Sequence, residues 1–251
     1  MAVWFPALLA SLSSAERKIV FLLHIHKSAG STLCEMAGAN GEIVNTVANC
    51  NVQQNQRCCG GDSLLEHRAY ARTSRYTFVA AEGPMYSVMD HAHFEYVVIM
   101  RRSIDRYYSH YRHVERLYRG GSTFEAWMDG QPDNWNVRQL CGTRCLRVPK
   151  FKLAITHYLY TLNRLRAFDF VIRLDHFQSD LRRFAGARHW SERLDLHVNP
   201  GEHGTGSPNA AAFRAMTYLD DALAAGLEEP RVPHELPLNY SLPCGAICTQ
   251  Y

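Results

Sequence analysis

Four short apolar segments rich in β-branched and aromatic residues recur along the chain, and amphipathic segments separate them. We expect strands near residues 18–25, 76–81, 95–100 and 168–174. We expect helices near residues 31–39, 62–74, 103–118, 150–166, 176–185 and 208–225. Strands that alternate with helices are typical of a parallel sheet with helical crossovers. The sequence therefore predicts an α/β fold in which helices flank a central parallel sheet.

The first predicted strand ends in a loop of small and charged residues. This loop reads Lys27-Ser28-Ala29-Gly30-Ser31-Thr32, and a helix-forming stretch follows it. A strand, a small-residue turn and a helix N-terminus bring backbone N–H groups and the positive end of the helix dipole together, so such a loop can hold an anion. In a Walker A loop the lysine follows the glycines, whereas Lys27 precedes the loop's only glycine. The loop predicts a phosphate- or sulfate-bearing ligand, with an ordinary surface turn as the alternative.

A second cationic group follows the predicted strand at 95–100. Arg101 comes directly after this strand, Ser103 is a favourable helix N-cap, and Ser109 lies about two turns further on. Ligands bind at the carboxyl edge of open parallel sheets, so Arg101 and Lys27 are expected at the same edge. This arrangement suits a ligand with two separated anionic groups. A solvated basic helix is the alternative, but it does not explain an arginine at the end of a strand.

These two motifs resemble the nucleotide-binding signatures of sulfotransferases that use 3′-phosphoadenosine 5′-phosphosulfate (PAPS). The similarity is greatest to the Golgi carbohydrate enzymes, which include the heparan sulfate 2-O- and 6-O-sulfotransferases, although His26 stands where that family has proline. The resemblance implies a P-loop-NTPase-like three-layer fold. It implies that the lysine loop holds the 5′-phosphosulfate, and that Arg101 and Ser109 hold the 3′-phosphate. The implied cofactor-binding residues are Lys27, Ser28, Ala29, Gly30, Ser31, Thr32, Arg101 and Ser109.

Sulfuryl transfer also calls for catalytic groups. An in-line displacement builds negative charge on the bridging oxygen that leaves, and we expect Lys27 to stabilise it. The acceptor hydroxyl needs a general base, for which we select Glu82 at the end of the strand between the two motifs. His91 and His93 are the alternative bases and the candidate substrate-binding residues. We expect no metal site, because this H-x-H pair lacks a third ligand at a recognisable spacing.

Length and charge are compatible with one sulfotransferase domain over residues 1–251. The chain is 47% hydrophobic and carries a formal net charge of +3. A basic tail, a zinc-finger spacing and an RNA-recognition motif are all missing from the sequence, which argues against a nucleic-acid partner. The resemblance implies a hydroxyl acceptor on a glycan. Two alternatives remain: a nucleotide kinase or other phosphotransferase, and a non-catalytic glycan- or anion-binding relative.

Cysteine usage favours an oxidising compartment. The chain has eight cysteines, an even number, and most stand in loop-like clusters. Together with the glycosylation sequon at Asn239, this predicts disulfides and the Golgi lumen or secretory pathway, with a cytoplasmic protein holding free thiols as the alternative. Residues 1–15 include an apolar stretch that fits a leader or an anchor remnant. Since this stretch is too short to span a bilayer, we expect no integral membrane span.

Overall fold

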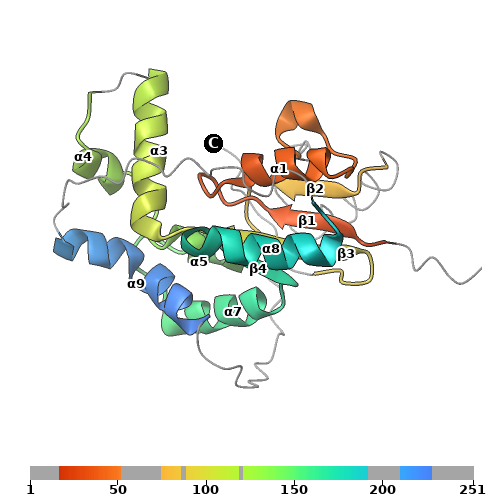
Figure 1. The fold of residues 1–251 in the computed structure, drawn as a ribbon. Coiled ribbons are helices and arrows are strands. Elements are labelled where there is room, and N and C mark those ends of the chain that lie inside the picture. The colour runs from red at the N-terminus through yellow and green to blue at the C-terminus, as the bar shows by residue number, and fades with distance from the viewer. Residues whose placement is uncertain (1–16, 52–74, 86–88, 119–120, 192–209, 228–251) are drawn as a thin grey trace, which may run out of the picture.

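A computed structural model describes residues 17–51, 75–85, 89–118, 121–191 and 210–227, and these form a parallel sheet with helices on both faces (Figure 1). The strands are β1 (Ile19–Leu23), β2 (Phe78–Ala81), β3 (Phe94–Met100) and β4 (Phe170–Arg173). Their order across the sheet is β2-β1-β3-β4, and every neighbouring pair is parallel. The predicted α/β class and the four predicted strands are confirmed.

The helices differ more from the expectation. The α-helices are α1 (Gly30–Ala39), α3 (Ser103–Tyr118), α4 (Phe124–Asp129), α5 (Trp135–Cys141), α6 (Thr143–Leu146), α7 (Ile155–Arg166), α8 (Phe177–Arg188) and α9 (Ala210–Gly226). Short 3₁₀ turns cover Thr46–Ala48 and Leu174–His176. Sequence patterning does not predict α4, α5 or α6. The helix predicted at 150–166 begins earlier than α7 does, because Pro149 and a turn with Phe151 in the left-handed region (φ 62°) precede this helix.

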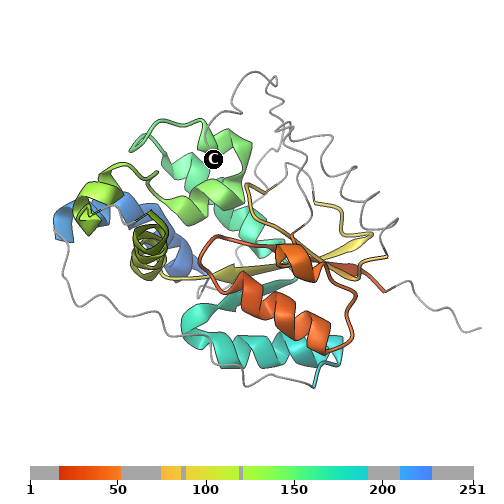
Figure 2. The same cartoon turned by 90° about the horizontal axis from the view of Figure 1, so that it is seen from above.

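The sheet lies between helices (Figures 1 and 2), and its two faces belong to different apolar cores. Successive side chains of a strand point to opposite faces, so Val20 and Leu22 of β1 belong to one core while Phe21 and Leu23 belong to the other. Helices α1 and α8 cover the first face, and α5, α7 and α9 cover the second. This gives three layers, compatible with the expected three-layer arrangement.

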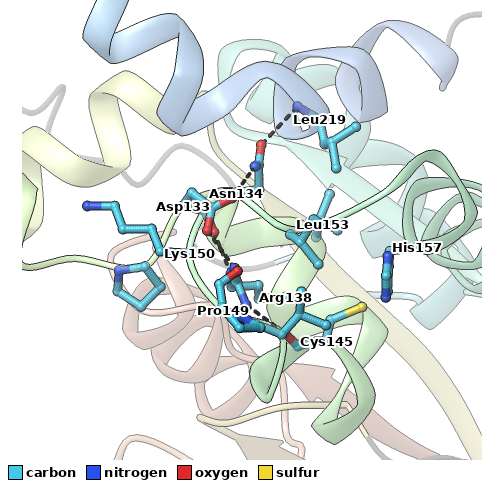
Figure 3. A network of polar contacts seen from close by, with 12 residues as sticks. Asp133, Asn134, Arg138, Cys145, Pro149, Lys150, Leu153, His157 and Leu219 are labelled. Carbon is cyan, nitrogen blue, oxygen red and sulfur yellow. Dashed lines mark hydrogen bonds and ion pairs between the residues drawn. The ribbon is translucent and has the colours of Figure 1, made fainter.

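A buried polar network holds the second helical layer together (Figure 3). The guanidinium of Arg138 on α5 donates to Oδ1 of Asp133 at 2.5 Å and to the carbonyl of Cys145 at 2.6 Å. Asn134, just before α5, accepts a hydrogen bond from the backbone N–H of Leu219 on α9 at 2.8 Å. Because each partner is buried and hydrogen-bonded, this network fixes α5 against both α6 and α9.

Two disulfides are present among the described residues. Cys34 of α1 is bonded to Cys50, and Cys141 is bonded to Cys145. No helix among the described ranges is both long and apolar enough to cross a membrane. Several expectations lie outside the described residues: the leader at 1–15, the helix at 62–74, the sequon at Asn239 and the cysteines at positions 58, 59, 244 and 248.

Candidate anion-binding site

The strand order creates a point where the connections diverge. After β1 the chain continues to β2 on one side, and after β3 it continues to β4 on the other, although β1 and β3 are neighbours. In open α/β sheets, ligands bind in the crevice outside the carboxyl ends of two such strands. Lys27 follows β1 and Arg101 follows β3. The two cations named by the separate sequence motifs therefore flank the same crevice.

The loop from Lys27 to Gly30 has an unusual backbone. Lys27 and Ala29 both adopt positive φ angles, 67° and 62°, in the left-handed region. Ala29 occupies the N-cap position of α1 and supplies no side-chain cap, so the first N–H groups of this helix are not satisfied by the usual oxygen. The hydroxyl of Ser28 is wholly buried and has no hydrogen-bond partner among the described residues. A helix N-terminus and an unpaired buried hydroxyl together provide donors for an anion.

Arg101 is held beside this loop. Its Nη1 donates to the backbone carbonyl of Lys27 at 3.0 Å. Its own carbonyl accepts from Nδ2 of Asn136 at 3.2 Å. The buried carboxylate of Asp220 on α9 accepts from the backbone N–H of Asn136 at 3.1 Å and from Ser103 Oγ at 2.7 Å. Residues from α3, α5 and α9 thus fix the backbone that carries Arg101.

The crevice has an excess of positive charge. Burial lowers the pKa of Lys27, and the charges of Arg116 and Arg101 lower it further, while Glu82 alone opposes them. Arg116 belongs to α3 and is exposed. Repulsion between these cations would be relieved by a bound anion.

Glu82 follows β2 and lies on the other side of the lysine loop. One of its oxygens is hydrogen-bonded to Nδ1 of His26, and both side chains are about one third exposed, at 37% and 31%. Burial acts to raise the pKa of Glu82, but the hydrogen bond from His26 and the electrostatic interactions with His24, His26 and Lys27 outweigh it, so the pKa is lowered. Glu82 is therefore an ionised carboxylate at neutral pH.

Two histidines of α3 complete this side of the crevice. The ring of His26 lies 4.7 Å from that of His110 and 5.9 Å from that of His113, centroid to centroid, in edge-to-face contacts. His110 also contacts the ring of Trp127 on α4 at 5.2 Å. His26, His110 and His113 were not among the predicted site residues. The position of His110 and His113 on one face of α3 could be read from their i, i+3 spacing. Their approach to His26 depends on the tertiary packing of α3 against the β1–α1 loop.

The remaining predicted site residues are Ser109, His91 and His93. Ser109 is half-buried on α3 and directly precedes His110, whose ring contacts His26. His91 and His93 precede β3, at the edge of the sheet opposite Lys27, and a strand of this length separates the edges by about 20 Å. They pair instead with carboxylates of that edge, His91 with Asp169 and His93 with Asp90. The structure does not bring these two histidines to the crevice.

A cavity of about 180 Å³ adjoins Arg101. Its lining includes Arg101, Arg102 and Ser103 after β3, Arg173 at the end of β4, and Asp220 on α9. Arg102 is largely exposed and pairs with Asp105 at 3.5 Å, whereas Arg101 points back to the lysine loop. Arg101 therefore belongs to the crevice, whereas Arg102 lies at its rim. Among the described residues, no group of three or more histidine, cysteine or acidic side chains is placed to hold a metal ion.

Comparison with other proteins adds no assignment. No protein-family model matches the chain, and no characterised protein matches it significantly.

Proposed function

We propose that this protein is a PAPS-dependent sulfotransferase that moves a sulfuryl group to a hydroxyl acceptor. The observation that carries the proposal is the hydrogen bond from Arg101 Nη1 to the Lys27 carbonyl at 3.0 Å. Two motifs more than 70 positions apart were each expected to bind one phosphate of a bisphosphorylated nucleotide. Their meeting at the divergence of β1 and β3 supports a single ligand with two anionic groups.

The residues of the crevice fit such a ligand. The unpaired hydroxyl of Ser28 and the open N-terminus of α1 are suited to the 5′-phosphosulfate, with Arg101 and Ser109 toward the 3′-phosphate. When bound, PAPS supplies the activated sulfuryl group. Lys27 stabilises the negative charge that develops on the bridging oxygen, and its partly buried setting strengthens this interaction. Glu82, the predicted base, acts on the acceptor hydroxyl alone or through His26.

We further propose a glycan acceptor and a P-loop-like identity for the fold. The aromatic rings of α3 and α4, which pack against one another beside the crevice, provide apolar surface of the kind that sugars stack on. The disulfides Cys34–Cys50 and Cys141–Cys145 are cross-links that persist in oxidising compartments, which supports the Golgi lumen or secretory pathway.

The test is ligand-induced thermal stabilisation with the desulfated product 3′-phosphoadenosine 5′-phosphate (PAP), ATP and GTP. We expect PAP at about 100 times its Kd to raise Tm by about 5–10 °C, and ATP and GTP to have much smaller effects. Lys27→Ala and Arg101→Ala should each weaken the PAP response at least about tenfold in apparent Kd, because each removes one phosphate contact. Lys152→Ala, an exposed lysine of the loop before α7, is the matched control and should respond like the parent.

Each alternative function has its own signature in this experiment. Stabilisation by ATP equal to that by PAP would indicate a phosphotransferase instead. No PAP response in the parent protein would reject the proposal outright. A PAP response without transfer of sulfate from radiolabelled PAPS to pooled desulfated heparin, chondroitin and neutral oligosaccharides would favour a binding relative.

A further inference from the structure

The two loops that follow β1 and β2 place a histidine and a carboxylate side by side. Leu23 and Ala81 are paired in the parallel register of these strands, so the segments that carry His26 and Glu82 leave the sheet side by side. Nδ1 of His26 is hydrogen-bonded to Oε1 of Glu82, although 56 positions separate the two residues in the chain. Both side chains remain partly exposed on the crevice side of the sheet edge.

This hydrogen bond determines which ring nitrogen carries the proton. Glu82 is ionised at neutral pH because His26, His24 and Lys27 together lower its pKa against the effect of burial. An ionised carboxylate can only accept hydrogen bonds, so Nδ1 of His26 must be the donor. In its neutral form the ring then keeps its lone pair on Nε2.

Resting on the proposed function, we infer that Nε2 of His26 is the group that takes the proton from the acceptor hydroxyl, and that Glu82 is the positioning residue that holds the ring. An imidazole is intrinsically a stronger base than a carboxylate and is the group used most often for proton transfer near neutral pH. The second oxygen of Glu82 has no such advantage, because the charges that keep this carboxylate ionised also weaken it as a base.

The surroundings of His26 hold its ring in a fixed orientation. Lys27 follows His26 in its own loop and His24 precedes it at the end of β1. The loop after β2 contributes Glu82, and α3 contributes further ionisable neighbours. Those α3 neighbours are His110, His113 and Arg116. Burial lowers the pKa of His110 to about 3, with His26, Arg106, His113 and Lys27 acting in the same direction, so His110 stays uncharged and packs its ring against His26.

The inferred step is balanced without any further reactant. The acceptor oxygen forms a bond to sulfur while the bond between sulfur and the bridging phosphate oxygen breaks, and that oxygen keeps the electron pair. The acceptor proton moves to Nε2 of His26, which becomes an imidazolium stabilised by the carboxylate of Glu82. Lys27 compensates the charge on the departing oxygen.

Four variants of the full chain distinguish a base from a positioning residue. His26→Ala should lower kcat for sulfate transfer from PAPS to the pooled glycans at least about 100-fold without changing the Kd for PAP. Added imidazole should restore part of that rate. Glu82→Gln should cost less than His26→Ala, because the glutamine oxygen can still accept from Nδ1 although it no longer compensates the charge of the imidazolium. Glu82→Ala should cost more than Glu82→Gln, and His189→Asn at the end of α8 is the control that should leave the rate unchanged.

The contrary results are equally specific. If Glu82 were the base itself, Glu82→Gln would be as inactive as Glu82→Ala, while His26→Ala would retain most of the rate; this overturns the inference but not the sulfotransferase proposal. Histidine-selective ¹⁵N spectra supply a readout independent of turnover. The Nδ1–H form of His26 should be present in the parent at pH 7 and reduced in Glu82→Ala. A parent spectrum with His26 in the Nε2–H form would overturn the inference even if no acceptor in the pool reacts.

Discussion

At the scale of single residues, the ring of His24 explains why position 30 is glycine. A β-carbon at Gly30 would overlap the imidazole of His24, which is buried at the end of β1. Burial is also the main reason that the pKa of His24 is lowered, so this ring is a packed, neutral group under the first turn of α1. The close approach of helix and strand at this point sets the position of the loop from Lys27 to Gly30.

Gly30→Ala should therefore disturb the site more than its small size suggests. The added methyl must displace either the His24 ring or the start of α1, and we expect a loss of about 1–3 kcal/mol in the free energy of unfolding. We also expect weaker PAP binding. The matched control is Gly186→Ala in α8, where a β-carbon meets nothing within 4 Å and helix propensity should stabilise the protein by up to about 1 kcal/mol. Urea unfolding of both variants checks the contrast, and equal stability changes would contradict it.

The sequence predicted the positions of individual charged residues better than the side chains that they contact. Lys27 and Arg101 could be placed at one sheet edge because each directly follows an apolar strand. The contact between His26 and Glu82 could not, since it depends on the register of two strands that are far apart in the chain. The left-handed conformations of Lys27 and Ala29 were equally invisible, because neither residue type favours a positive φ.

At the scale of elements, Glu42 joins the end of α1 to the end of α8. Its carboxylate is buried and accepts from Nη2 of Arg188 at 2.9 Å and from Nε1 of Trp190 at 3.1 Å. Burial acts to raise the pKa of Glu42, but hydrogen bonds and the charge of Arg188 outweigh it, so the pKa is lowered. The two helices of this layer are thus connected by a charged contact next to the apolar core.

Glu42→Gln should destabilise the protein by about 2–4 kcal/mol at pH 7, because it removes one member of a buried ion pair. A carboxyl group whose pKa is lowered on folding stabilises the protein above its unfolded pKa, near 4.5, and loses that contribution as the pH falls. The difference between parent and variant should therefore shrink below about pH 4.5. Glu115→Gln, which breaks a more exposed pair with Arg112, is the control and should cost about 1 kcal/mol or less. Denaturant unfolding from pH 3 to 7 measures both.

Elements with a clear pattern of apolar residues were predicted, and those without one were missed. The four strands are short apolar runs, which is the strongest signal for a buried parallel sheet. All seven residues of α5 are buried, so this helix has no polar face and no amphipathic pattern to detect. Helices α4 and α6, of six and four residues, are too short to show a period at all.

At the scale of the whole molecule, the two disulfides lie in different layers. Cys34–Cys50 joins α1 to the segment that runs beside β2, in the same core as α8. Cys141–Cys145 joins α5 to α6 in the opposite layer. The disulfide at Cys34 was not expected, because a cysteine inside an amphipathic helix gives no sign of a cross-link.

Removing each disulfide by paired alanine substitutions should lower stability by different amounts. The cross-link between Cys34 and Cys50 spans 16 positions and should contribute about 3 kcal/mol, whereas that between Cys141 and Cys145 spans four and should contribute about 2 kcal/mol. Calorimetry of the two double variants under non-reducing conditions compares them. A larger loss for the shorter loop would show that packing of the sulfur atoms, and not loop closure, governs the effect.

The carboxylate of Asp220 reaches back 117 positions to the hydroxyl of Ser103 and, through Asn136, to the backbone of Arg101. Ribosomes make proteins from the N-terminus, so Lys27 and Arg101 leave the exit tunnel long before this restraint exists. A nascent chain that has been translated only as far as α7 contains both cations but lacks the carboxylate of Asp220. If the proposed function holds, competence for nucleotide binding is acquired only when α9 emerges and docks.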